Sequence, residues 1–126
     1  MILGVQDIYY YVRDMGRALR FYRDTLGLRV TYESDHWTAL DVGGVKVGLH
    51  ETDGGRPVPP VPKDAGGAKA GGTLTLRVGD IRAEVAHLRA AGVKFLGEIY
   101  DADWGSTVAF EDPDANVLKL MQPPGS

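Results

Sequence analysis

The chain has 126 residues, a formal net charge of −3, 44% apolar residues and 25% charged residues, a composition typical of one globular domain. The negative balance and the lack of a Lys/Arg run argue against a nucleic-acid partner, and the absence of cysteine excludes disulfides and thiol chemistry. No apolar run reaches the roughly 18 residues that span a bilayer, and the N-terminus does not look like a signal peptide. We therefore expect a cytoplasmic protein without membrane contact.

The first elements are a strand and a helix. Apolar and polar side chains alternate over residues 5–12, and after Asp14 the apolar spacing changes to three and four. Asp14 is a good N-cap residue, and Gly27 follows the last turn, where a left-handed residue ends many helices. Three strand-like runs come next, LRVTYES, HWTALDV and VKVGLHE, with the hairpin signal VGGV between the last two.

Residues 51–72 differ in composition, because they hold four of the seven prolines and six of the glycines. Proline removes a backbone donor and glycine adds chain entropy, so we expect neither helix nor sheet in this segment. It is predicted to be a surface loop joining two halves.

The second half repeats the first. Val12, Asp14 and Gly27 have counterparts in Val78, Asp80 and Gly92, and three strand-like runs again follow, VKFLGEIYD, STVAFED and NVLKLMQ. A four-stranded sheet with one helix cannot bury both of its faces alone. We therefore predict an α+β fold in which two βαβββ modules form a curved mixed sheet around a central cup, with the helices outside. Residues 1–126 are expected to form one domain, with module one at 1–50, the linker loop at 51–72 and module two at 73–122.

The stretches VRDMGRALRFYRDTLGLRV and VAFEDPDANVLKL resemble the vicinal-oxygen-chelate superfamily, which includes glyoxalase I, extradiol dioxygenases and fosfomycin- and bleomycin-resistance proteins. The resemblance covers nearly the whole chain. It implies a cup in which metal-dependent members hold one divalent ion with a side chain from each of four strands. In those members the ion acts as a Lewis acid on two neighbouring substrate oxygens.

The four corresponding positions here are Asp7, Gly48, Thr73 and Lys119. They make a poor metal site, because glycine has no donor atom, a threonine hydroxyl is a weak ligand and an ammonium group repels a cation. We expect no metal and no cofactor; an atypical site using Asp7 and His50 is left open.

Asp7 is expected to face the cup and to pair with Lys119, since an unpaired buried carboxylate is costly. The pair either replaces the metal as a structural bridge or orients a ligand and transfers a proton. The candidate catalytic residues are Asp7, His50 and Lys119. The residues expected to contact a ligand are Asp7, Tyr9, Tyr11, Trp37, His50, Thr73, Thr75, Trp104 and Lys119.

Several of these residues also have a purely structural interpretation. The tyrosines suit strands in general, the tryptophans suit a core or a dimer contact, and a lone histidine is more often a hydrogen-bonded structural residue than a catalytic one.

Three functions remain open at this stage. The preferred one is a metal-free protein of the glyoxalase/bleomycin-resistance type, which sequesters an aromatic or amphipathic small molecule in the cup and so confers antibiotic resistance. The alternative is a small lyase, isomerase or dioxygenase with an atypical or absent metal site. A third is an association module with a vestigial cup. A homodimer is expected in each case.

Overall fold

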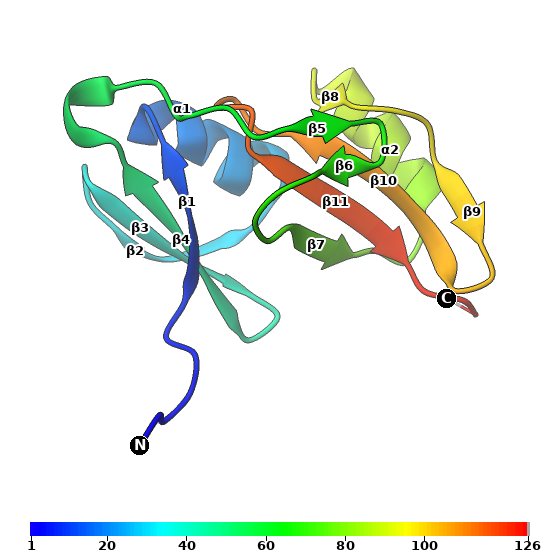
Figure 1. The fold of residues 1–126 in the computed structure, drawn as a ribbon, viewed down its shortest axis with the longest axis horizontal. Coiled ribbons are helices and arrows are strands. Elements are labelled where there is room, and N and C mark those ends of the chain that lie inside the picture. Colours follow the sequence, from blue (N-terminus) through cyan, green and yellow to red (C-terminus); the bar gives the residue numbers. More distant parts are fainter. Residues whose placement is uncertain (126) are drawn as a thin grey trace. The chain divides into compact units, whose positions relative to one another are not determined.

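The computed structural model describes residues 1–125, which divide into two compact units, residues 1–59 and residues 60 onward. Each unit has its own sheet and its own helix (Figure 1). Within the described residues no helix combines the length and apolar character needed to cross a membrane.

The first unit is a four-stranded mixed sheet with one helical segment. Strand β1 runs parallel to β4, and the other neighbours are antiparallel, in the order β1-β4-β3-β2. The elements are β1 (Ile8–Val12), α1 (Met15–Leu19), a π-helical continuation (Arg20–Thr25), β2 (Arg29–Glu33), β3 (Trp37–Val42) and β4 (Val45–Glu51).

Local signals in the sequence explain where these elements begin and end. The Asp14 carboxylate accepts a hydrogen bond from the Arg17 backbone N–H at 2.8 Å, which caps the helix as predicted. Gly27 closes the helical segment at φ +74°, and Gly43 and Gly44, at φ +59° and +92°, form the predicted turn between β3 and β4.

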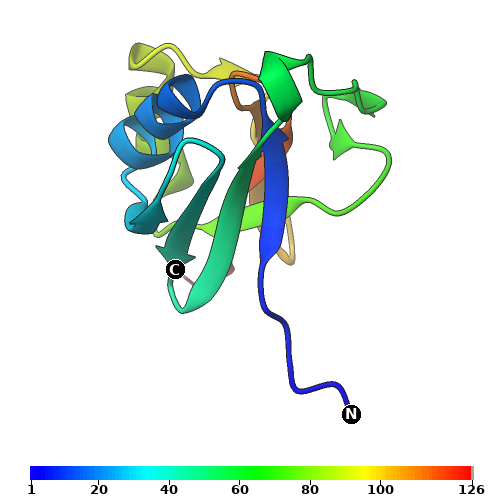
Figure 2. The same cartoon turned by 90° about the vertical axis from the view of Figure 1, so that its left-hand side faces the viewer.

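One face of this sheet packs against the helical segment, and the other does not. Figure 2 shows α1 on one side of the strands, with the N-terminal residues extending from the edge at β1. The buried side chains under the helix are Val12, Ala18, Leu19, Tyr22, Leu40, Val47 and Leu49. Residues alternate across a strand, so the positions between these buried ones lie on the opposite face.

The second unit repeats this topology. Its sheet has the order β7-β11-β10-β8, with β7 parallel to β11, and β9 also pairs with β10. The elements are β7 (Leu74–Arg77), α2 (Ile81–Ala90), β8 (Lys94–Phe95), β9 (Tyr100–Ala102), β10 (Gly105–Glu111) and β11 (Val117–Gln122). The Asp80 carboxylate caps α2 by accepting from the Ala83 N–H at 3.1 Å. The α+β class and the two βαβββ modules are therefore confirmed, whereas a single cup shared by both modules stays a prediction.

Two sequence-based expectations were wrong. Residues 51–72 contain a short 3₁₀ turn (Asp53–Gly55) and a hairpin of β5 (Lys63–Asp64) and β6 (Gly67–Ala68). The hairpin forms because the Asp64 carboxylate accepts the Gly66 N–H at 2.8 Å, and because the Lys63 ammonium lies 3.1 Å from a Glu111 carboxylate oxygen. The run VKFLGEIYD is not one strand: β8 and β9 pair with different parts of β10.

Candidate ligand-binding site

The face of the first sheet opposite the helix carries four ring side chains, Tyr9, Tyr11, Trp37 and His50, which we call the aromatic surface. Strand register brings them together, because His50 pairs with Tyr11 on β1 and with Trp37 on β3. Ring centroids are 5.4 Å apart for Tyr9–Tyr11, 5.8 Å for Tyr9–Trp37 and 5.1 Å for Tyr11–His50. The Tyr9–Tyr11 and Tyr9–Trp37 pairs are edge-to-face, which is favourable at these separations, and the Tyr11–His50 pair is tilted.

Gly48 lies beneath this surface, and its lack of a side chain is what allows the surface to form. A Cβ built at Gly48 would stand only 2.0 Å from Cη2 of Trp37 and 2.6 Å from its Cζ2. The indole therefore crosses the strand diagonally and occupies the space that a side chain at position 48 would need. The sequence-based description of position 48 as a gap is incomplete, because Trp37 fills it.

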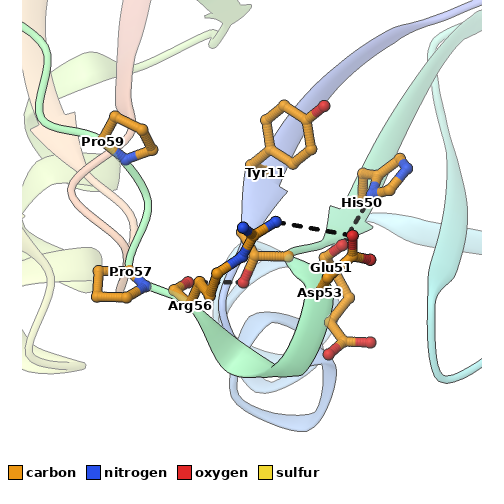
Figure 3. A pocket seen from close by; sticks show the side chains of 8 residues that line it. Tyr11, His50, Glu51, Asp53, Arg56, Pro57 and Pro59 are labelled. Carbon is orange, nitrogen blue, oxygen red and sulfur yellow. Dashed lines mark hydrogen bonds and ion pairs between the residues drawn. The ribbon is translucent and has the colours of Figure 1, made fainter.

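A cavity of about 420 Å³ adjoins the aromatic surface at Tyr11 and His50. Figure 3 shows these two side chains on the strand side and Pro57 and Pro59 on the opposite side, with Arg56 between them. The remaining lining residues are Glu51, Thr52 and Asp53. At about 420 Å³, the cavity is within the usual range for small-molecule sites.

The wall of this cavity is held in place by hydrogen bonds that backbone carbonyls accept. The Thr52 N–H donates to the Val12 carbonyl at 2.9 Å, which ties the end of β4 to β1. The Thr52 hydroxyl donates to the Arg56 carbonyl, and the Arg13 Nε–H donates to the Gly55 carbonyl, at 2.6 and 2.8 Å. The turn that carries Arg56 is thus fixed to the sheet before any ligand arrives.

His50 has a defined hydrogen-bond role. Its Nδ1 lies 2.8 Å from the Glu51 backbone carbonyl, and because a carbonyl only accepts, Nδ1 must carry the proton. In the neutral ring, Nε2 then carries a lone pair and can accept a hydrogen bond. The Glu51 side chain instead meets His36, whose Nδ1 is 2.7 Å from the carboxylate.

Tyr9 is chemically distinct from an ordinary tyrosine. A hydrogen bond with the Tyr11 side chain, helped by the negative charge of Asp7, raises the pKa of the Tyr9 hydroxyl. Asp7 itself precedes β1 and is half-buried.

The second unit contains the other predicted ligand-contact residues. Lys119 on β11 pairs in register with Thr75 on β7, and it lines a cavity of about 350 Å³ together with Trp104. Thr75 is exposed, and Thr73 is half-buried just before β7. The predicted Asp7–Lys119 pairing would join the two units and stays a prediction.

The residues present do not suit the divalent ion that the superfamily resemblance implies. Trp37 covers Gly48, so no donor can be introduced there without moving the indole. Lys119 brings a positive charge to the last strand. Within residues 1–125 there is no group of three or more His, Asp or Glu side chains that could hold a metal ion. Divalent sites of this kind generally need at least three protein ligands.

Two groups of lining residues were missed by the sequence reasoning. Arg56, Pro57 and Pro59 belong to the predicted linker loop and were not named among the ligand contacts, although the prolines signal a stiff backbone beside His50. Tyr100, whose ring centroid lies 6.2 Å from that of Trp104, was not selected. Its position just before the β9–β10 turn was the available signal.

Two βαβββ units in one chain define a fold class that hosts several different functions on one scaffold. The sequence profile of the Glyoxalase/Bleomycin resistance protein/Dioxygenase superfamily matches residues 4–120, and the chain belongs to this superfamily.

Individual relatives are distant. The uncharacterised protein YetH of Bacillus subtilis is 25% identical over 122 residues, which cover 97% of this chain and all of YetH. The metallothiol transferase FosB of Staphylococcus haemolyticus is 35% identical over 51 residues, which cover 40% of this chain and 37% of FosB.

Solved structures show the same fold. The fosfomycin resistance protein FosX of Listeria monocytogenes superimposes with a TM-score of 0.74 at 15% identity, covering 99% of this chain and 97% of FosX. Lactoylglutathione lyase of Agrobacterium tumefaciens gives a TM-score of 0.67 at 16% identity, covering 96% of this chain and 94% of the lyase.

Proposed function

We propose that this protein binds an aromatic or amphipathic small molecule without a metal ion, and that it sequesters this ligand on the aromatic surface. The observation that carries the proposal is the Trp37 indole lying over Gly48, at one of the positions where metal-dependent relatives are expected to place a ligand side chain. A flat ring in place of a metal ligand changes the chemistry of the site from coordination to stacking.

Exposure of the rings supports a binding role. Tyr9 and Tyr11 are 45% and 44% exposed, although each forms ring contacts with its neighbours. An exposed cluster of large rings next to a cavity marks a surface that gains free energy when a ligand covers it. The tyrosine hydroxyls add polar groups that suit an amphipathic ligand.

A small enzyme is the alternative, and one observation favours it. His50 presents its Nε2 acceptor while Nδ1 is held by the Glu51 carbonyl, which is the arrangement of a general base. A lyase or isomerase would use this group as its base, with Asp7 of the same unit as a second proton-transfer group. Such an enzyme would convert its ligand chemically, whereas a sequestering protein releases the ligand unchanged.

Fluorescence of Trp37 tests the proposal directly. The chain has two tryptophans, so Trp104→Phe leaves Trp37 as the single indole reporter. We expect bleomycin or another planar aromatic compound to quench Trp37 saturably in this variant. Tyr9→Ala should weaken that binding about fivefold, because one stacking partner contributes about 1 kcal/mol.

Ile8→Ala is the matched control. Ile8 is 52% exposed on β1 and pairs in register with Val47, on the face toward the helix, so its truncation should leave binding unchanged. Equal losses in both variants, or no saturable quenching with any aromatic compound, would refute the proposal. Recovery of a chemically altered ligand after incubation would favour the enzyme.

We also propose a homodimer. The apolar side chains of Met1, Ile2, Leu3 and Val5 are between 83% and 109% exposed, and such a run next to an edge strand suits a contact with a second copy. Sedimentation equilibrium should give twice the chain mass of 13.6 kDa, and a monomer would contradict this.

A further inference from the structure

We infer that the first unit has a second binding site, an arginine pocket that takes the phosphate group of a small solute. The pocket has a volume of about 310 Å³ and is lined by Arg13, Asp14, Arg17, Arg20 and Gly55. It shares no residue with the aromatic surface, and its volume is at the lower end of the range for small-molecule sites.

Three arginines line the pocket. Arg17 and Arg20 are three residues apart on the helical segment, and Arg13 lies just before its N-cap, Asp14. The one acid in the lining, Asp14, accepts the Arg17 N–H at 2.8 Å and so offsets the charge of the helix terminus. The lining contains one carboxylate, and Arg13 and Arg20 supply positive charge to it in a chain whose formal net charge is −3.

The pocket is formed before a ligand binds. The Arg13 Nε–H donates to the Gly55 carbonyl at 2.8 Å, and Gly55 is itself held by its N–H to the Thr52 carbonyl at 3.2 Å. A guanidinium has five N–H donors, so this bond leaves the terminal nitrogens of Arg13 able to meet an oxyanion. The planar guanidinium holds its N–H donors in a fixed geometry that matches two oxygens of a phosphate group.

Gly16 lies close to two of the side chains that line the pocket. A Cβ at this position would stand 3.3 Å from Asp14 Oδ1 and 3.6 Å from Arg20 Nη1. The Arg20 guanidinium therefore lies beside Gly16 in the first turn of the helix. A long side chain at position 16 would compete with it for this space.

Most other arginines of the chain already have a carboxylate partner. Ion pairs with Asp or Glu are formed by Arg23, Arg29, Arg56, Arg82 and Arg89. Within the described residues of the first unit, Arg13 and Arg20 form no ion pair with a carboxylate. Both residues line the pocket, in which Asp14 is the one carboxylate, and this excess of positive charge favours an external anion.

Pyrophosphate and inorganic phosphate are suitable probes for the intact chain. In low-salt buffer, calorimetry should show saturable binding of one pyrophosphate per chain and weaker binding of phosphate, with sodium chloride at equal ionic strength giving no saturable signal. Added salt should weaken the binding, because part of the attraction is screened. Backbone amide shifts should cluster at residues 13–20 and at Gly55.

Arg20→Gln and Arg77→Gln form a matched pair of variants. Both residues are exposed, but Arg77 lies on β7, outside the pocket. Arg20→Gln should weaken pyrophosphate binding about tenfold, the effect of losing one charge-assisted hydrogen bond, and Arg77→Gln should leave it unchanged. Equal losses in the two variants would show diffuse attraction to the surface and overturn the inference, as would a lack of saturable binding in the millimolar range.

Discussion

The space above Gly48 provides a quantitative test of the site. In Gly48→Ala the new methyl group would stand 2.0, 2.6 and 2.7 Å from Cη2, Cζ2 and Cζ3 of Trp37, so the indole must swing off the sheet. Overpacking of this kind costs about 1–3 kcal/mol, and the loss of two ring contacts, to Tyr9 at 5.8 Å and to His50 at 6.1 Å, adds about 1 kcal/mol more. We expect the free energy of unfolding to fall by about 2–4 kcal/mol.

Urea unfolding, followed by far-ultraviolet circular dichroism, measures this change in four proteins. They are the wild type, Gly48→Ala, Trp37→Ala and the double variant. The cost of Gly48→Ala should almost disappear when Trp37 is already alanine, because nothing then opposes the methyl group.

Gly79→Ala serves as the control, since a Cβ there meets nothing within 4 Å and the backbone does not have a positive φ. If Gly48→Ala is as harmless as Gly79→Ala, or costs the same with and without Trp37, the described placement of the indole is wrong.

Three further predictions concern local interactions. Tyr11→Phe should bring the raised pKa of Tyr9 back toward its ordinary value near 10, which NMR titration of the tyrosine rings would detect; an unchanged titration would contradict the hydrogen bond between the two hydroxyls. Asp80→Ala should lower the unfolding free energy by about 1 kcal/mol through loss of the α2 cap, with Asp80→Asn close to wild type in the same urea assay; equal effects would argue against capping. The Ser106 hydroxyl lowers the pKa of Asp101, so this carboxylate stabilises the fold above its unfolded pKa near 3.9, and the contribution is lost as pH falls through the lower folded value. Ser106→Ala should raise the titration midpoint of Asp101 in NMR, and no change would exclude the bond.

The parts of the fold that depend on local chemistry were predictable from the sequence. Asp14 and Asp80 cap helices because a carboxylate at that point satisfies free N–H groups whatever the rest of the chain does. Gly27 and Gly92 adopt positive φ where the helices end, at +74° and +89°. The repeat of these signals was enough to predict two βαβββ modules.

The features that depend on contacts between distant residues were not predictable in the same way. The β5–β6 hairpin has only two residues in each strand, and it is held by the Lys63–Glu111 ion pair across 48 positions of sequence, a contact that composition cannot reveal. Likewise the sequence identified Gly48 and Trp37 separately. Only the register of β3 with β4, and the rotamer of the indole, show that one fills the space left by the other.

The central proposal is that stacking on the aromatic surface replaces metal coordination. It is tested most directly by equilibrium dialysis of the wild-type protein, purified without chelators, against Mn²⁺, Ni²⁺ and Zn²⁺, with elemental analysis of the protein afterwards. We predict well under one bound ion per chain for every metal. One tightly held ion per chain that disappears in Asp7→Ala or His50→Ala would contradict the proposal.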